Sequence, residues 1–368
     1  MSPNFDGGME IDMKEDTKED MNPLMKEVPL ETDQKQTGSS DTSNWIAGID
    51  IGGTKTLMLL SSQGVASELH ERQLPTCVSE HPDVFFQWLF TELGKFCHDV
   101  GIRVSQLSGV GMGFPGVILQ DEGVLRNAPA FQWPEQDIRP VIVRHYSGNI
   151  ILDNDVNLAA MGEYDQGAAQ GHKHCVMVTV GTGIGAALIL NGQLYSGQNG
   201  AAGEIGHFIA GDVGLHDCYV AEPDAFGVFE QVTSGTGITK LAKRYFADGR
   251  GSSLSLVMSL AGGEAEQIQA RHVFKAAEAG DAAALEILEL PLRYMARGLA
   301  NIVALLNPSI IVIGGGVAAS NPSYYLNEVR TRLSRYTVLP SHIAVAELGS
   351  SAGAIGALAA IRLRLTHQ

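Results

Sequence analysis

The stretch Ile46–Leu60 constrains the fold most. It reads IAGIDIGGTKTLMLL, in which two apolar runs are separated by a short segment that begins with Asp50 and contains Gly52 and Gly53. This pattern predicts a strand, a tight turn and a second strand. Glycines in such a turn let backbone N–H groups approach an anion closely, and Asp50 could hold a hydrated Mg²⁺ beside that anion. Taken alone, the stretch is equally compatible with an ordinary hairpin.

The same order of predicted elements occurs twice along the chain. Three strands are followed by helix, strand, helix, strand and helix, first from Trp45 and again from Cys175. The second copy carries a large helical insertion between Ser234 and Leu306. Such an internal repeat predicts an α/β fold with two similar domains that flank a cleft, where strand ends and glycine turns meet.

Two further glycine turns support a phosphate-binding interpretation. Val180–Gly185 repeats the hairpin turn in the second copy, and Gly314–Gly316 follows the buried strand predicted at Ile310–Ile313. The dinucleotide fingerprint is excluded, because no helix follows either glycine pattern that fits it on paper, at Gly111 and at Gly181. The chain also contains no Gly-x4-Gly-Lys-Ser/Thr run.

Polar residues that suit chemistry on a hydroxyl group cluster in three places. Asp153-Asn154-Asp155 lies between a predicted buried strand and a helix, where one residue is expected to cap the helix and a carboxylate could accept a proton. Glu204 and His207 lie in a glycine-rich stretch, and Glu230 precedes a helix. Together they suit a polyhydroxylated ligand such as a sugar, although Glu230 alone is equally typical of a first-turn helix acid.

Charge and cysteine usage limit the other function classes. The net charge is −16, and residues 1–44 contribute eleven acids against four lysines, or −7. This acidic, non-periodic segment is expected to be a disordered tail. An acidic chain with no apolar run of membrane-spanning length argues against nucleic acid and membrane as partners. The scattered cysteines, Cys77, Cys97, Cys175 and Cys218, indicate reduced thiols and a cytoplasmic location.

Six motifs, in chain order, resemble the ROK family of repressors, open reading frames and sugar kinases, and its bacterial glucokinases most closely. The motifs are DIGGTK, GFPG, NDVN, GTGIG, GAAGEIGH and IVIGGGV. The resemblance covers the chain from about Trp45 to its end. It implies an actin-like, ribonuclease H-like ATPase fold, with a small domain at 45–153 that is completed by a helix at 351–368, and a large domain at 154–350.

The resemblance also implies roles for single residues. Asp155 matches the catalytic base, and sugar contacts are implied for Asn154, Asp155, Glu204, His207, Glu230 and Gly116. ATP contacts are implied for Gly52, Gly53, Thr54, Lys55, Thr182, Gly183, Gly314, Gly315 and Gly316. Asp50 matches a residue that holds Mg²⁺ through water.

Two departures from the family pattern stand out. The zinc-binding cysteines of the family are missing, since Val228 replaces the last of them and only Cys218, with His216 and Asp217, lies near His207. We therefore expect no structural zinc, because three successive side chains do not converge on one ion. Near the sugar, Ala130 stands where the family often has an asparagine.

The expected activity is therefore an ATP- and Mg²⁺-dependent hexose kinase, most closely a glucokinase that forms glucose 6-phosphate. The alternatives are a kinase for N-acetylmannosamine, fructose or mannose, and a non-catalytic sugar-responsive regulator. The resemblance implies a homodimer. The sequence does not rank the hexoses, because discrimination rests on a few hydrogen bonds of unseen geometry.

Overall fold

The computed structural model describes residues 44–63, 68–79, 81–119, 123–126, 128, 131–209 and 227–366. The predicted acidic tail lies outside these residues except for Asn44. Within the described ranges, no helix is both long and apolar enough to cross a membrane.

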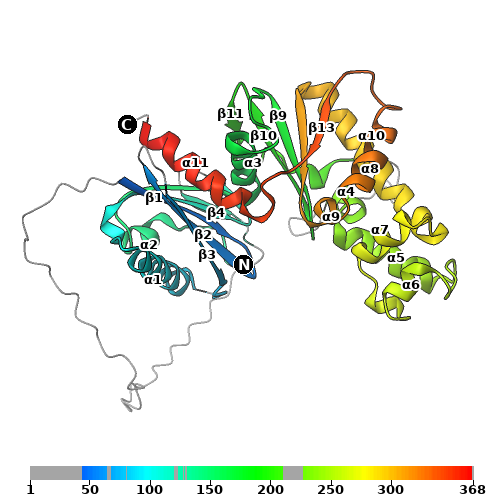
Figure 1. Ribbon diagram of the computed structural model, residues 1–368, viewed down its shortest axis with the longest axis horizontal. Helices are drawn as coiled ribbons and strands as arrows, with labels where there is room; N and C mark the ends of the chain where they lie inside the picture. The colour runs from blue at the N-terminus through cyan, green and yellow to red at the C-terminus, as the bar shows by residue number, and fades with distance from the viewer. Residues whose placement is uncertain are drawn as a thin grey trace, which may run out of the picture. The chain divides into compact units, whose positions relative to one another are not determined.

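Two five-stranded sheets of matching topology confirm the predicted repeat (Figure 1). The first has the order β3-β2-β1-β4-β8 and the second the order β11-β10-β9-β12-β13. In each sheet the first three strands of the chain pair antiparallel and the last two join in parallel. The strands of the first sheet are β1 (Asn44–Ile51), β2 (Lys55–Gln63), β3 (Leu69–Pro75), β4 (Leu107–Phe114) and β8 (Asn149–Asn154). Those of the second are β9 (Cys175–Val180), β10 (Ile184–Leu190), β11 (Gln193–Tyr195), β12 (Ile310–Gly314) and β13 (His342–Val345).

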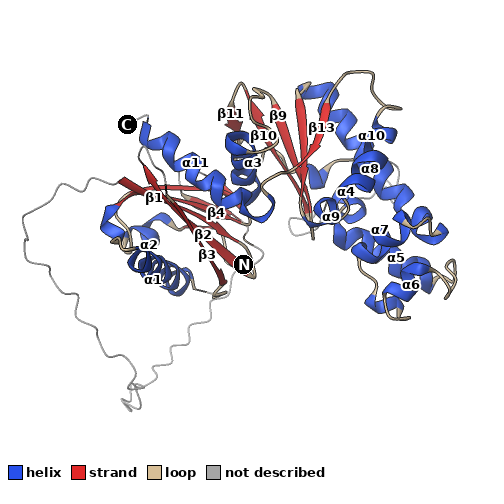
Figure 2. Ribbon diagram, in the orientation of Figure 1, coloured by secondary structure: helices blue, strands red, loops and turns tan. Residues whose placement is uncertain are grey.

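The helices lie between and after these strands, and five of them, α4 to α8, follow one another between β11 and β12 (Figure 2). They are α1 (Pro82–Val100), α2 (Arg139–Val143), α3 (Asp155–Gln166), α4 (Val228–Thr233), α5 (Gly235–Ala247), α6 (Leu256–Leu260), α7 (Ala270–Glu278), α8 (Ala282–Leu306), α9 (Gly316–Ser320), α10 (Pro322–Leu333) and α11 (Ala352–Thr366).

The sequence of Asp137–Tyr146 predicts a helix over that whole stretch, and this prediction is wrong at both ends. The helix is reduced to α2, and Gln136–Asp137 instead forms strand β7 of a small third sheet, β5-β6-β7, that was not predicted. The other strands of this sheet are β5 (Val117–Leu119) and β6 (Val124–Arg126). Its strands have only two or three residues each, too few to show an alternating pattern in the sequence.

The apolar spacing of Pro82–Gly101 predicts a helix with one apolar face that ends at Gly101. Helix α1 has this face and covers one side of the first sheet with it. Phe85, Phe86 and Leu89 are fully buried against strand residues such as Phe114. The helix ends where predicted, because Gly101 adopts the left-handed conformation (φ 87°) that a helix C-terminus requires.

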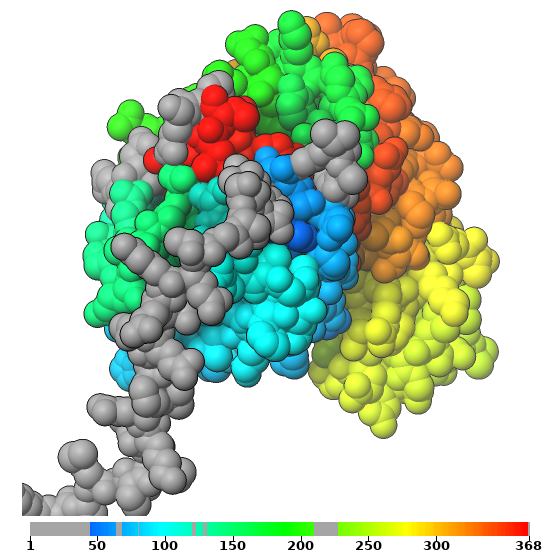
Figure 3. All heavy atoms as spheres, turned by 60° about the vertical axis from the view of Figure 1, so that its left-hand side comes forward, coloured from blue at the N-terminus to red at the C-terminus, as the bar shows by residue number. Residues whose placement is uncertain are grey.

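Helix α11 covers the opposite face and packs closely against both the sheet and α3 (Figures 1 and 3, red). A Cβ atom on Gly111 in β4 would lie 2.3 Å from the carbonyl oxygen of Ala357. A Cβ atom on Gly356 would lie only 1.7 Å from the carbonyl oxygen of Leu158 in α3. Backbone therefore touches backbone at both contacts. The domain boundaries at 153/154 and 350/351 stay a prediction.

The second sheet is covered by the helical insertion and α10. Helix α8 contributes the largest share of that core, with Leu288, Tyr294 and Leu299 among its buried residues. Tyr325 of α10 packs on Phe274 of α7, with ring centroids 5.7 Å apart. This core carries the wall of the cavity described below.

The α3–α11 contact generates a prediction about stability. Gly356→Ala should lower the melting temperature by about 5 °C or more, because the added methyl group overlaps a backbone carbonyl that cannot move alone. Gly94→Ala in α1 is the matched control. Its Cβ would meet only Val104 Cγ2, at 3.8 Å, so helix propensity should leave that variant equally or slightly more stable. Equal melting temperatures for the two variants would contradict the close packing.

Candidate active site

The first glycine turn joins β1 to β2, as predicted. The Gly52 N–H donates to the carbonyl of Lys55 at 2.9 Å, and the side chains of Thr54 and Lys55 are exposed. Asp50, at the end of β1, lies below this turn and is largely buried. The turn is thus closed by its own hydrogen bond and follows directly after a partly buried carboxylate.

The second turn has the same character in the second sheet. The Gly181 N–H donates to the carbonyl of Gly183 at 3.0 Å. The carbonyls of Gly181 and Thr182 accept hydrogen bonds from the N–H groups of Gly235 (2.8 Å) and Thr236 (3.2 Å), at the start of α5. The start of a helix in the insertion therefore fixes the position of this turn.

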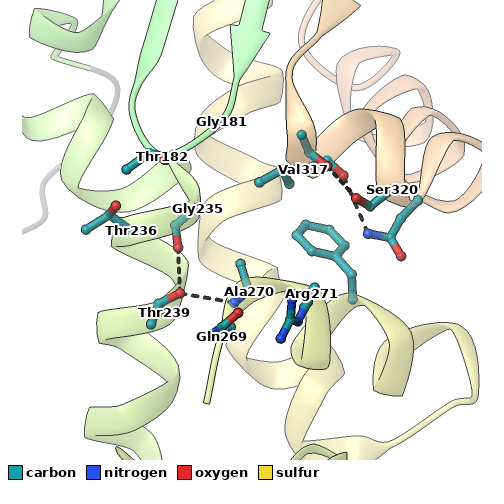
Figure 4. Close-up of a pocket in the computed structure, with 13 residues that line it drawn as sticks. Gly181, Thr182, Gly235, Thr236, Thr239, Gln269, Ala270, Arg271, Val317 and Ser320 are labelled. Atoms are coloured by element: carbon teal, nitrogen blue, oxygen red, sulfur yellow. Dashed lines mark hydrogen bonds between the residues drawn. The ribbon is translucent and has the colours of Figure 1, made fainter. Parts of the chain in front are cut away.

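A cavity of about 640 Å³ opens beside the second turn (Figure 4). Its volume suits a ligand of nucleoside size. Thr239 braces one wall, because its hydroxyl donates to the Gly235 carbonyl at 2.7 Å and accepts the Ala270 N–H at 3.0 Å. The lining residues are Gly181, Thr182, Gly235, Thr236, Thr239, Gln269, Ala270, Arg271, Phe274, Gly316, Val317, Ser320 and Asn321.

The third glycine run serves this cavity in two ways. Gly315 has φ 86°, and a Cβ atom there would lie 2.5 Å from the Val180 carbonyl oxygen, so only glycine fits. Gly316 lines the cavity, whereas Gly314 is buried at the end of β12. The run brings the start of α9 close against the end of β9.

The junction of β8 and α3 holds the predicted polar residues. Asn154 caps α3, since its Oδ1 accepts the N–H groups of Val156 (2.9 Å) and Asn157 (3.2 Å). Its Nδ2 donates to the carbonyl of Gly116 at 2.9 Å. The carboxylate of the next residue, Asp155, also accepts the Val156 N–H, through its Oδ1 at 2.9 Å.

Asp50 and Asp155 form a partly buried acidic pair. Gly113 of β4 lies between them, because a Cβ there would lie 3.6 Å from both the Oδ1 of Asp50 and the Cα of Asp155. Burial, and then the charge of Asp155, raise the pKa of Asp50 to about 7. Burial, and then the charge of Glu204, raise the pKa of Asp155 to about 6, against the opposing effect of backbone N–H groups.

Glu204, His207 and Glu230 extend this acidic group. Loss of hydration is the largest effect on the pKa of Glu204 and raises it, although the residue remains exposed. The charge of Glu230 also raises this pKa, and the charge of His207 lowers it. Glu230 is fixed differently, because its Oε2 accepts the Ile184 N–H at 3.0 Å, directly after the second turn. The site therefore joins several carboxylates to one imidazole.

The structure groups the predicted site residues into two sets. Thr182 and Gly316 line the cavity, and Gly183 lies next to Glu230. The acidic set contains Asp50, Asp155, Glu204, His207 and Glu230. Most of the cavity wall, including Thr239, Gln269, Arg271, Phe274 and Ser320, was missed. No motif marks these residues, because they come from separate segments of the chain: α5, the start of α7 and, beyond the insertion, α9.

Two sequence predictions concern residues that the structure does not describe. His216, Asp217 and Cys218, the candidate zinc ligands, lie outside the described ranges, as do Pro129 and Ala130. Among the described residues, no group of three or more His, Cys, Asp and Glu side chains is placed to hold a metal ion. Phe229 is buried and packs against Phe208, with ring centroids 5.9 Å apart.

Comparison with known proteins places this geometry in context. The model of the ROK family matches residues 46–363. A glucokinase of Halalkalibacterium halodurans is 32% identical over 86% of this chain and 94% of its own length. An N-acetyl-D-glucosamine kinase of Mannheimia succiniciproducens is 28% identical over 85% and 97%. A crystal structure of a ROK family glucokinase from Streptomyces griseus, in complex with glucose and AMPPNP, has a TM-score of 0.65 and 26% identity, covering 85% of this chain and 98% of that one.

The acidic pair generates a prediction about pH. The folded chain holds the Asp155 proton more tightly than the unfolded chain, so the free energy of unfolding falls as pH rises from about 4 to about 6. Asp155→Asn removes this loss and keeps the acceptor for the Val156 N–H. Without ligand, the variant should therefore be more stable than the wild type at pH 8, by about 2–3 kcal/mol. At pH 5 the difference in stability should be smaller.

Thermal unfolding at both pH values checks this. Asp99→Asn is the control, because Arg72 lowers the pKa of that exposed carboxyl, so its removal should not stabilise the chain at pH 8. If the wild type is as stable as Asp155→Asn at pH 8, the ionised Asp155 carboxylate does not destabilise the fold and the prediction is wrong.

Proposed function

The chain belongs to the ROK family and is a sugar kinase, and we propose that it transfers the γ-phosphoryl group of ATP to the 6-hydroxyl of glucose. The observation that carries the proposal is the position of Asp155. This partly buried carboxylate lies at the start of α3, where its charge acts on Asp50 and the charge of Glu204, another member of the acidic set, acts on it.

Asp155 fits the role of general base. A base works best when its pKa lies near the working pH, and burial raises that of Asp155 to about 6. It would orient the 6-hydroxyl and accept its proton as the phosphoryl group leaves ATP. Asn154, Glu204, His207 and Glu230 would bind the other sugar hydroxyls, and the amide and carboxylates together offer both donors and acceptors.

The donor would be held by backbone and by the cavity. The N–H groups of both glycine turns suit phosphate oxygens, and the cavity beside Thr182 and Gly316 suits the nucleoside. Phosphoryl transfer depends mostly on positioning and charge stabilisation, so little other chemistry is needed.

The residues present fit Mg²⁺ at Asp50. A dication would offset the loss of hydration and the neighbouring charge of Asp155, which in that order raise the pKa of Asp50 to about 7. Phosphate oxygens and water would complete the coordination, as is usual for this metal. When bound, Mg²⁺ would neutralise charge on the phosphates.

Glucose is proposed over other sugars because the relative with 32% identity is named a glucokinase. The relative named as an N-acetyl-D-glucosamine kinase is less similar, at 28%. N-acetylmannosamine, fructose and mannose remain alternatives. The intact Asp155 and both glycine turns favour a catalytic protein over a non-catalytic regulator. We also propose a cytoplasmic homodimer that binds neither nucleic acid nor membrane, from the family resemblance, the charge and the cysteine pattern.

A coupled assay with ATP, Mg²⁺ and a panel of hexoses tests the proposal. Glucose should give the highest kcat/KM. Asp155→Asn should reduce phosphoryl transfer about 10²–10⁴-fold while AMPPNP still binds, because the variant loses the base but keeps the fold. Turnover within tenfold of wild type would remove Asp155 from the role of base, and a higher kcat/KM for N-acetylated hexoses would redirect the substrate assignment.

We also propose that the protein holds no structural zinc. Val228 cannot ligate a metal, and the aromatic packing of Phe229 would stabilise the segment instead. Elemental analysis of purified protein should find far less than one zinc per chain, and a zinc-selective chelator should leave the melting temperature and activity unchanged. Stoichiometric zinc whose removal weakens sugar binding would disprove this.

A further inference from the structure

Thr76, directly after β3, contacts the first glycine turn at three points. Its Oγ1 lies 2.7 Å from the Gly52 carbonyl oxygen and 2.9 Å from the Oγ1 of Thr56. Its N–H donates to the Thr54 carbonyl at 3.0 Å. One residue thus holds the carbonyls at both ends of the segment that contains Gly53.

The direction of these hydrogen bonds follows from the proton count. A hydroxyl has a single proton, and the carbonyl of Gly52 can only accept. Thr76 therefore donates to Gly52, and Thr56, which is fully buried, donates to Thr76. Every polar group in this chain of hydroxyls is satisfied, so the arrangement is rigid.

The segment that carries Thr76 is itself anchored. The indole N–H of Trp133 donates to the Ser79 carbonyl at 2.7 Å, and Trp133 is 4% exposed. The Val78 N–H donates to the Thr76 carbonyl at 3.1 Å. Thr76 can therefore hold the turn without moving towards it.

The brace determines where the Gly53 N–H points. In a planar trans peptide the carbonyl and the following N–H point in opposite directions. Because the Gly52 carbonyl points at Thr76, the Gly53 N–H points away from β3. Among the described residues it has no hydrogen-bond partner. An N–H held in this way, in a glycine turn beside Asp50, is suited to a phosphate oxygen.

The second turn supports this reading independently. There the carbonyls of Gly181 and Thr182 are held from outside by the N–H groups of Gly235 and Thr236. The same peptide geometry points the N–H groups of Thr182 and Gly183 to the other side. In both turns, hydrogen bonds from outside the turn hold the carbonyls and so orient the N–H groups. The donor is Thr76 in the first turn and the start of α5 in the second.

We propose that Thr76 is a positioning residue for the nucleoside triphosphate, one that orients the Gly53 N–H toward a phosphate group. This proposal rests on the function proposed above. It predicts a defect confined to the nucleotide, because Thr76 holds the turn and is not among the residues assigned to the sugar.

Three substitutions test the proposal. Thr76→Val keeps the shape but removes the hydroxyl that holds Gly52, Thr76→Ser keeps the hydroxyl, and Thr56→Val removes the second hydroxyl while leaving the Thr76–Gly52 bond intact. Calorimetric titration with AMPPNP and Mg²⁺, and separately with glucose, gives each dissociation constant without turnover. Melting temperatures are measured on the same samples.

Thr76→Val should weaken AMPPNP binding about tenfold, the effect of losing one well-oriented hydrogen bond to a charged group. Glucose affinity should stay within about twofold of wild type, and Thr76→Ser should bind AMPPNP like wild type. Thr56→Val should lower the melting temperature without weakening AMPPNP binding.

The outcomes separate this proposal from the one on which it rests. Equal AMPPNP affinity in Thr76→Val and wild type would overturn the positioning role alone. Equal weakening in Thr56→Val and Thr76→Val would also overturn it, because general loosening of the fold would then explain both. A wild type with no affinity for AMPPNP would overturn the proposed kinase function itself.

Discussion

Backbone contact between α11 and its neighbours is the constraint on which the rest of the structure depends. Gly356 lets α11 approach α3 so closely that a single methyl group would overlap the Leu158 carbonyl, and Gly111 does the same in the sheet. The start of α11 also touches Asp50, since a Cβ on Gly353 would lie 2.6 Å from its Cγ. Asp155 begins α3. The packing of two helices therefore brings together two carboxylates that lie far apart in the sequence.

That packing has an electrostatic cost, which the site can use. Asp50 and Asp155 lose hydration, and neither gains a counter-charge among the described residues around it. This loss of hydration is the largest of the causes that raise their pKa values to about 7 and about 6. A carboxylate destabilised in this way is a better proton acceptor and a stronger cation ligand than an exposed one. The same loss of hydration that weakens the ligand-free fold would thus suit Asp155 to the proposed role of base and Asp50 to the proposed metal.

The sequence predicted those parts of the fold and site that depend on local pattern. Both sheets, the two hairpin turns and helix α1 follow from runs of apolar residues punctuated by glycine and proline, which report local backbone geometry. The wall of the cavity could not be predicted, because Thr239, Arg271 and Phe274 come together only through the packing of α5, α7 and α8. The roles of Thr56 and Thr76 escaped notice for the same reason, since a threonine after a strand is common and its partners lie across the sheet.

The two halves of the fold contain a similar glycine turn, but different groups hold it in place. In the second half, α5 holds the turn through Gly235 and Thr236 and also forms part of the cavity wall, so any shift of α5 moves the turn and the wall together. In the first half, Thr76 connects the turn to a loop that is anchored by Trp133. None of the cavity-lining residues lies in this loop. A nucleoside in the cavity can therefore influence the second turn directly, through a shared helix. Thr76 does not connect the first turn to the cavity wall. The conformation of the first turn must therefore be fixed before a ligand binds, and the hydrogen-bonded hydroxyls of Thr56 and Thr76 fix it.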